Sequence, residues 1–389
     1  MSPRHTPFQT LRLSAEERQH CQDRSFQLLD RTLRSYDERD GQGDDSRRAT
    51  PLHHSNLENT RWKLLKTQAD ASLYTARHNC TLDDHNLLGG GWKDPVVVLT
   101  VGTIRGDLDE IMLGISMPDV SSFRVRTELF TKQPVDCAIL ADLSGPTEVD
   151  PFQHVGIQWM VYKHAWPVKT MVRPRDFVTL ACTGTMTRAN GDYIGYEMAQ
   201  PARLSQCPPL PGAIVRNKVM YAAIFKQQEP GVVDVFIHTY VESQGAILDK
   251  LIVSITLKGN LGFWNAEKLA EMKKLQWCIA NRRSERMKEQ QRASSSPRGV
   301  CKHCHDRREL MKPCGQEDKS VCVLCASLTC WGCRVERKLK VLDESTARLS
   351  DKHVVVCHSC LAFVQQLRPR DIALRNHKER RLRLQRAST

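Results

Sequence analysis

Long apolar runs are the first thing that this sequence lacks. Among its 389 residues, no uninterrupted apolar stretch approaches about 18 residues, which is the length that a membrane-crossing helix needs. The amino-terminal run Met1-Ser2-Pro3-Arg4-His5 has no apolar core, so no secretory signal peptide is predicted. We therefore expect a cytoplasmic protein that binds endomembranes peripherally if it binds them at all.

The sequence also lacks the local motifs of common enzyme classes. It contains no P-loop, no G-x-G-x-x-G after a strand and no H-E-x-x-H, and its 14 histidines are scattered without a nucleophile at a recognised spacing. Aromatic residues make up only 6% of the chain and do not alternate with the basic stretches, so specific nucleic-acid binding by base stacking is not expected. We expect a protein without catalytic residues.

Cysteine, in contrast, is concentrated near the carboxyl terminus. Eight of the 15 cysteines form four C-x2-C pairs, namely Cys301/Cys304, Cys322/Cys325, Cys330/Cys333 and Cys357/Cys360. A C-x2-C pair can direct two thiolates to one point, and Zn²⁺ takes four such ligands in a tetrahedron. A disulfide framework is the alternative, but it belongs to secreted proteins and no signal peptide is predicted. We therefore predict two structural zinc ions with no open coordination position.

The middle of this array, Cys322-Val323-Leu324-Cys325, four residues, and Cys330-Trp331-Gly332-Cys333, resembles the centre of a FYVE zinc finger. The cross-brace ligation of that family implies that Cys301, Cys304, Cys330 and Cys333 hold one zinc. It implies that Cys322, Cys325, Cys357 and Cys360 hold the other. The basic run that FYVE domains place around the third ligand is absent, because Lys319-Ser320-Val321 precedes Cys322. The resemblance thus implies the metal scaffold but no pocket for phosphatidylinositol 3-phosphate.

RING fingers share the cross-brace, which leaves a ubiquitin-ligase adaptor as an alternative function. They usually carry a histidine and a shorter gap in the central block, and the all-cysteine array favours the FYVE type. A basic zinc protein that binds nucleic acid is a further alternative.

The net charge of +13 is carried by two stretches that flank the cysteine array. The stretch from Lys273 to Lys302 has nine basic residues against two acidic ones, and the stretch from Arg368 to Thr389 has eight against two. Such clusters favour anionic surfaces, including acidic lipid head groups. The alternative for any charge run is a solvated helix face or a disordered tail.

The rest of the chain changes from helical to strand patterns and back. Helices are predicted at residues 11–36, at Leu57–Arg77 and, briefly, at Asp107–Gly114. Residues rich in Val, Ile, Thr and aromatics predict strands at Val96–Val101, Phe123–Phe130, Val135–Leu143, His154–Tyr162, Phe177–Met186, Tyr193–Met198, Ile214–Phe225 and Val232–Val241. The Asn190-Gly191 step between two of these strands is a hairpin signal, so the sheet should be antiparallel and curved.

A helical pattern returns after Gly245, where Leu248, Leu251, Ile252 and Ile255 follow i, i+3, i+4 and i+7, with a possible break at Gly259-Asn260. A curved sheet that grips such a helix can leave a tunnel suited to a lipid-sized ligand. We take Leu248, Ile252 and Ile255 as candidate lipid-binding residues. The alternative is that side chains fill the space and leave an ordinary α+β core.

The order of elements and the stretch Val172-Arg173-Pro174-Arg175-Asp176-Phe177-Val178-Thr179-Leu180-Ala181-Cys182 resemble the START family of steroidogenic acute regulatory protein-related lipid-transfer domains. The likeness covers about residues 57–282. It implies a helix-grip fold of the α+β class that binds one hydrophobic molecule without chemistry. Sterol-handling members place an arginine where this chain has Ala181, which disfavours a sterol, and Arg175 with Asp176 is expected to be a structural pair.

The sequence therefore predicts a START-like domain followed by a small two-zinc finger. The expected domain organisation is an amino-terminal helix and linker at 1–50, a lipid-binding domain at 51–290, a linker at 291–300, a FYVE-like finger at 301–367 and a basic tail at 368–389. The expected function is non-catalytic lipid binding or transfer, with the finger docking to a membrane or to a protein.

Overall fold

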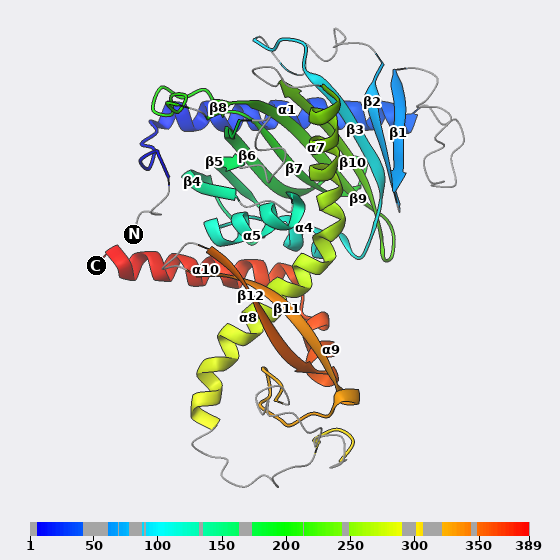
Figure 1. Ribbon diagram of the computed structural model, residues 1–389, viewed down its shortest axis with the longest axis vertical. Coiled ribbons are helices and arrows are strands. Elements are labelled where there is room, and N and C mark those ends of the chain that lie inside the picture. The colour runs from blue at the N-terminus through cyan, green and yellow to red at the C-terminus, as the bar shows by residue number, and fades with distance from the viewer. Residues whose placement is uncertain are drawn as a thin grey trace. The chain divides into compact units, whose positions relative to one another are not determined.

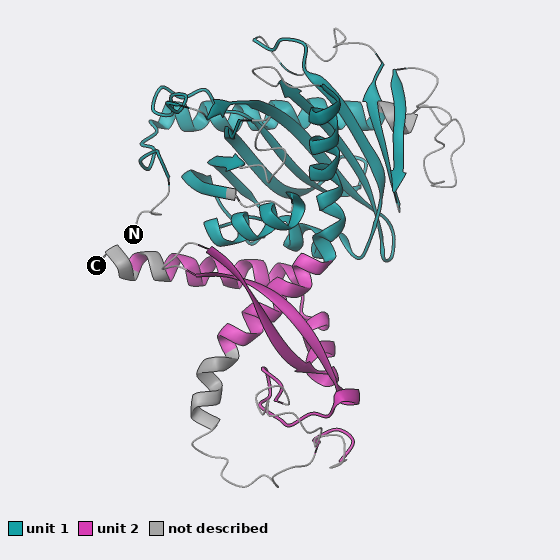
Figure 2. Ribbon diagram, viewed as in Figure 1, with its two compact units in different colours: residues 1–267 teal, residues 268–389 magenta. Residues whose placement is uncertain are grey.

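A computed structural model describes residues 6–41, 61–68, 70–77, 88, 91–131, 135–162, 173–212, 214–242, 249–289, 301–305, 321–343 and 348–388. The chain divides into two compact units, residues 1–267 and residues 268–389 (Figure 2). The division falls within helix α8 (Ala266–Glu289), whereas the sequence prediction places a linker at 291–300, outside the described residues.

The first unit is built on one large antiparallel sheet. Its strand order is β1-β2-β3-β10-β9-β7-β6-β5-β4, with the short β8 pairing in parallel with β6. The strands are β1 (Trp62–Gln68), β2 (Ala71–Ala76), β3 (Val96–Arg105), β4 (Val135–Ser144), β5 (His154–Tyr162), β6 (Arg175–Thr187), β7 (Tyr193–Pro201), β8 (Val215–Arg216), β9 (Lys218–Glu229) and β10 (Val232–Glu242). The predicted α+β class with a curved antiparallel sheet is confirmed (Figure 1).

Glycine turns join the central strands. Gly191, between β6 and β7, has a φ of +87°, and Gly231, between β9 and β10, has a φ of +80°. Residues with a Cβ rarely adopt this backbone region, which explains glycine at both turns. The hairpin predicted at Asn190-Gly191 is confirmed.

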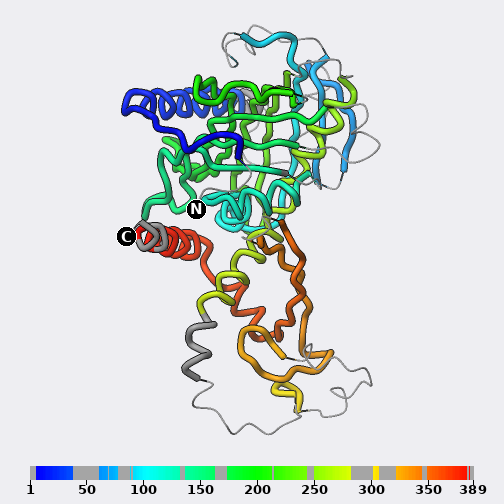
Figure 3. Tube along the Cα trace, turned by 60° about the vertical axis from the view of Figure 1, so that its left-hand side comes forward, coloured from blue at the N-terminus to red at the C-terminus, as the bar shows by residue number. Residues whose placement is uncertain are grey.

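Helix α1 (Ala15–Gly41) covers one face of the sheet (Figures 1 and 3). Its Leu28, Leu29 and Tyr36 form a core with alternate residues of the strands, such as Met220, Ala222 and Ile224 of β9. The amino-terminal residues Phe8, Leu11 and Leu13 extend this cover over alternate positions of β5 and β6. The predicted helix at 11–36 is confirmed as α1.

The opposite face is covered by helices α4 (Leu108–Ile115), α5 (Val120–Thr131) and α7 (Asp249–Leu261) and by the 3-10 turn η1 (Gly262–Asn265). Helix α4 confirms the short helix predicted there, and α7 ends close to the predicted break. Gly114 of α4 comes so close to the backbone of Ala266 that a Cβ would clash with its carbonyl oxygen, so the packing requires glycine at this position.

Two secondary-structure predictions in this unit are wrong. Residues 57–77 were expected to be a helix, but the described part forms the hairpin β1–β2. The strand predicted at Phe123–Phe130 is helix α5, whose first turn is capped by Asp119 through a 2.8 Å hydrogen bond from the Ser122 N–H to the Asp119 carboxylate. Arg124 and Arg126 alternate with apolar residues as in a strand, yet both are buried.

The second unit contains the remainder of α8, the hairpin β11 (Arg334–Asp343) and β12 (Arg348–Cys357), and helices α9 (His358–Gln366) and α10 (Pro369–Ser388). A short 3-10 turn, η4 (Trp331–Cys333), precedes β11. The α8 side chains bind the hairpin: Glu271 pairs with Arg337 at 2.6 Å, and Gln276 donates to the carbonyl oxygen of Lys340. The basic tail, for which a surface role and disorder were both open, is helical as α10.

Candidate ligand cavity and metal centres

A cavity of about 300 Å³ lies between the sheet and the helices of the first unit. Strands β5, β6, β7, β9 and β10 form its floor through the alternate residues that point away from α1. Helices α5 and α7 and the turn η1 form its roof. Apolar and aromatic residues line most of it: Met117, Phe123, Phe130, Met160, Tyr162, Phe177, Ala199, Val219, Tyr221, Val241, Leu251, Ile252, Ile255 and Phe263.

Two of the three predicted lipid-binding residues line this cavity. Ile252 of α7 is buried, and Ile255, one helical turn later, is 37% exposed, so it lies at the edge of the cavity. Leu248 lies outside the described residues. The part of α7 that faces the sheet is therefore the part that the helical spacing singled out, and ligand binding by these side chains stays a prediction.

Arg126, which lines the cavity, belongs to a buried ion pair that sequence reasoning missed. Arg126 of α5 lies 2.6 Å from the carboxylate of Glu197 on β7, and the Tyr221 hydroxyl donates to the same carboxylate oxygen at 2.6 Å. Burial has the largest single effect on the pKa of Arg126 and lowers it, but the charges of Glu197 and Tyr221 and the hydrogen bonds to both together raise the pKa above its usual value. Burial raises the pKa of Tyr221 well above its usual value, so the phenol keeps its proton and stays a donor.

Two aromatic rings hold the Arg126 guanidinium in place. The guanidinium carbon lies 4.5 Å from the ring centre of Phe130 and 5.1 Å from that of Phe263. These distances are typical of cation–π contacts. Gly262 allows this packing, because a Cβ there would clash with the Phe130 side chain. The cation is thus fixed by a carboxylate and two rings.

The polar residues Gln158 of β5 and Thr179 of β6 form part of the cavity floor. They face each other directly across the ladder between the two strands, and both line the cavity. The Gln158 amide nitrogen and the Thr179 hydroxyl are buried and have no hydrogen-bond partner among the described residues. No sequence pattern marked this pair, because its members lie on different strands and each reads as an ordinary strand residue.

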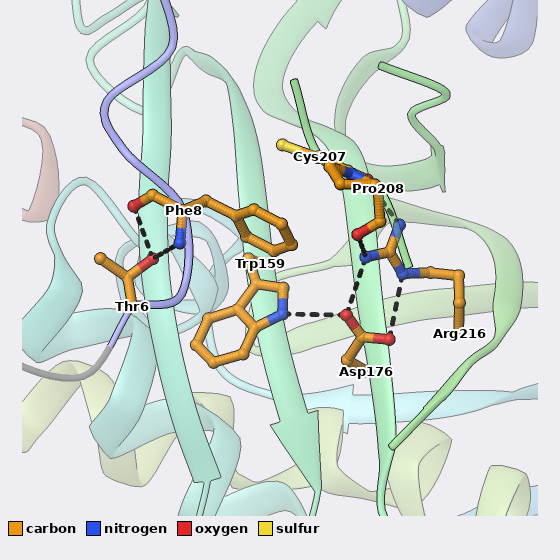
Figure 4. Close-up of polar contacts among 7 residues, drawn as sticks. All are labelled: Thr6, Phe8, Trp159, Asp176, Cys207, Pro208 and Arg216. Atoms are coloured by element: carbon orange, nitrogen blue, oxygen red, sulfur yellow. Dashed lines mark hydrogen bonds and ion pairs between the residues drawn. The ribbon is translucent and has the colours of Figure 1, made fainter. Parts of the chain in front are cut away.

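The expected pairing of Arg175 with Asp176 is wrong. Neighbouring residues of a strand point to opposite faces, and Arg175 lines the cavity while Asp176 lies on the other face. The Asp176 carboxylate accepts two hydrogen bonds from Arg216, at 3.0 and 2.9 Å, and one from the Trp159 indole at 3.1 Å (Figure 4). Phe8 packs against Trp159, so this cluster fixes the amino-terminal segment to the sheet.

Ala181, where the START resemblance expects an arginine in sterol-handling members, belongs to a row of small residues. It pairs with Gly156 of β5 on one side and with Ala199 of β7 on the other. Ala199 lines the cavity. A buried charge does line the cavity at Arg126, which comes from helix α5 instead.

The eight array cysteines gather into two groups of four in the second unit. Cys301, Cys304, Cys330 and Cys333 form one group, and Cys322, Cys325, Cys357 and Cys360 form the other. Within each group the sulfur atoms lie within 4.8 Å of one another. This is the cross-brace grouping that the FYVE resemblance implies.

The geometry of both groups fits tetrahedral tetrathiolate coordination. Four sulfurs about 2.3 Å from a Zn²⁺ ion lie roughly 3.8 Å apart, and the Cys304–Cys330 and Cys325–Cys357 sulfur separations are 3.4 and 3.8 Å. The backbone N–H of Cys330 points to the Cys301 sulfur at 3.4 Å, and that of Cys357 points to the Cys322 sulfur at 3.4 Å. Such bonds stabilise thiolates, so the two groups could hold metal ions.

Comparisons with known proteins give a weak structural likeness and no sequence match. No family model matches the chain, and no curated protein matches it. Among solved structures, human StAR-related lipid transfer protein 5 is similar over 65% of this chain and 97% of its own, with 13% identity and a TM-score of 0.43. Human STARD10 is similar over 58% and 82%, with 10% identity and a TM-score of 0.36. Likeness at this level identifies no ligand.

The described helices include none that is both long enough and apolar enough to cross a lipid bilayer.

Proposed function

We propose that this protein is a non-catalytic lipid-binding or lipid-transfer protein. The observation that carries the proposal is the cavity of about 300 Å³, whose lining is predominantly aliphatic and aromatic. Cavities of this size and lining bind small apolar molecules and orient them through a few polar groups.

The arrangement of the fold supports the proposal. The strands that form the floor bury both faces, because their alternate residues pack under α1 while the others line the cavity. Filling about 300 Å³ would require only a few larger side chains, and an ordinary core of this size would be close-packed. Because side chains leave this space open where an ordinary core would fill it, we take the cavity as the ligand-binding site. Ile252 and Ile255 of α7 are proposed to contact the ligand.

Lipid extraction from the purified full-length chain tests the proposal. Native mass spectrometry should show a protein species heavier than the apoprotein, and solvent extraction should release a stoichiometric amount of one lipid class. Replacing Ala199 by leucine should displace that lipid while the fold is kept, because the larger side chain occupies the cavity. A chain that purifies without lipid and takes up none from mixed vesicles would contradict the proposal.

We propose further that the second unit holds two structural zinc ions and docks the protein at a membrane or protein surface. All-cysteine ligation leaves no coordination position for water, so the metals would stabilise the fold and supply no catalysis. Helix α10 carries the exposed basic residues Arg375, Lys378 and Arg381 at spacings of three residues. Such a face favours anionic lipid head groups.

Vesicle flotation tests the docking proposal. The wild-type chain should float with vesicles that contain phosphatidylserine, and the variant Lys378→Glu/Arg381→Glu should float less. Vesicles of phosphatidylcholine alone serve as the control, since they present no net charge. Equal flotation with both vesicle types would refute electrostatic docking by α10.

A further inference from the structure

The uncharged pair Gln158 and Thr179 lies on the part of the cavity floor that strands β5 and β6 form. Gln158 is 2% exposed and Thr179 is 1% exposed, and both side chains line the cavity. The amide nitrogen of Gln158 and the hydroxyl of Thr179 have no hydrogen-bond partner within the described residues. Buried polar groups are nearly always paired, so two unpartnered groups directly opposite each other on one cavity wall point to a ligand.

Their chemistry defines what could satisfy them. The amide of Gln158 supplies a hydrogen-bond donor, and the hydroxyl of Thr179 can donate or accept. Neither group carries charge. A hydroxyl, a carbonyl, a carboxamide or a carboxylate could accept from both groups, and only the neutral ones avoid burying a charge without a counter-charge.

The charged residues of the lining are Arg126, Arg175 and Lys258, and the first two make contacts within the protein. Arg126 is paired with Glu197, so this ion pair has no net positive charge to offer an anionic ligand. Arg175 lies four residues before Thr179 on the same strand, which is about 13 Å away along the backbone. Its guanidinium donates to the carbonyl oxygen of Arg173.

We infer that Gln158 and Thr179 form a specificity subsite that binds one neutral hydrogen-bonding group of an otherwise apolar ligand, in preference to an anionic head group. The inference rests on the proposed function, because it assumes that the cavity binds an apolar molecule. It adds the polarity of the ligand and the position at which that polar group is bound.

Affinity for four single-chain compounds of equal length tests this subsite: an alkane, a primary alcohol, a primary carboxamide and a carboxylate. Each competes with a fluorescent fatty alcohol for the full-length chain. We expect the alcohol and the carboxamide to bind about tenfold more tightly than the alkane, which is the gain from one well-placed buried hydrogen bond. The carboxylate should bind more weakly than the carboxamide.

Near-isosteric variants locate the effect. Gln158→Met and Thr179→Val remove the polar atoms and keep the volume, so each should abolish the tenfold advantage of the carboxamide and leave alkane affinity unchanged. Thr179→Ser restores the hydroxyl and should restore the preference. Gln158→Met and Thr179→Val each remove a buried unpartnered group, so without ligand these two variants should melt no lower than wild type.

A matched control is Thr183→Val on the same strand. The Thr183 hydroxyl already donates to the carbonyl oxygen of Phe152 at 3.0 Å, and the residue does not line the cavity. This variant should lower stability and keep the preference for the carboxamide.

Each other outcome overturns a distinct claim. Equal binding of alkane and carboxamide would refute the subsite while leaving the cavity proposal intact. Tighter binding of the carboxylate would refute the preference for a neutral group. Failure of all four compounds and of the fluorescent probe to bind would refute the proposed function itself.

Discussion

Removing the charge of Glu197 should destabilise the first unit more than any loss of packing at that position would. Glu197→Gln keeps the size and the hydrogen-bonding oxygen but leaves the Arg126 guanidinium buried without a counter-charge. Removing one partner of a buried ion pair typically lowers the free energy of unfolding by about 3–5 kcal/mol. For a domain of this size, that corresponds to a fall in Tm of roughly 10 °C.

The double variant Arg126→Met/Glu197→Gln measures how much of the lost stability comes from leaving Arg126 without its counter-charge. It removes the buried cation as well, and replacing both charges of a buried pair is often neutral. We expect it to recover at least half of the stability that Glu197→Gln loses, with a coupling energy of about 2 kcal/mol. Asp30→Asn on the surface of α1 is the control: its partner Arg34 is exposed, so the cost should stay below about 1 kcal/mol.

The measurement must report the first unit alone, since a chain of two units need not unfold in one transition. Urea denaturation meets this need when unfolding is monitored by hydrogen exchange in peptides of β7 and β9. A loss below about 1 kcal/mol for Glu197→Gln would refute the reasoning, because it would mean that water or another group compensates Arg126.

Four further predictions concern other parts of the chain. The purified protein should contain two equivalents of zinc by plasma emission spectrometry, and chelation should remove hydrogen-exchange protection from β12 and α9 but not from β6. Gly262→Ala should lower stability by roughly 2 kcal/mol in urea, because its Cβ would clash with Phe130, and retention of wild-type stability would contradict that packing. Asp176→Asn should cost about 2–4 kcal/mol, because the Arg216 charge loses its partner, and a protease-resistant amino terminus in that variant would contradict the role of the cluster. Burial raises the pKa of the Cys182 thiol to about 12, so its contribution to stability is complete below the unfolded-state pKa of about 9 and is lost as the pH rises toward 12. Alkylation of native Cys182 at pH 8, read by mass spectrometry, would count against this burial.

The sheet could be predicted because its signals are local. Alternating apolar residues and turn residues such as Asn190-Gly191 located most strands, and β5 has the predicted bounds. The first hairpin could not be located in this way. Trp62, Leu65 and Leu73 fall at helical spacing, yet Leu65 is 40% exposed while Leu73 is fully buried, because pairing of β2 with β3 decides which residues are buried.

Helix α5 shows the opposite error. Its Val, Thr and Phe residues favoured a strand, but the segment is a helix whose Arg126 is buried because Glu197 neutralises it. That partner lies 71 residues away in sequence, and the third member, Tyr221, lies 24 residues beyond Glu197. The only local signal that could have corrected the prediction is Asp119, a helix-capping residue three positions before Ser122.

The metal centres and the cavity differ in how much of them the sequence contains. A C-x2-C pair places two thiolate ligands at a short spacing in the sequence, so the array was recognisable from its four pairs. Cavity residues obey the same alternation as core residues, so the sequence pattern does not separate the two. Gly156, Ala181 and Ala199 form a row of small residues across three strands, and Gln158 pairs with Thr179 about 7 Å along the same strands. The combination of missing volume beside unpartnered polar atoms becomes visible only when register is known, which is why the sequence could indicate a cavity but not the chemistry of what it binds.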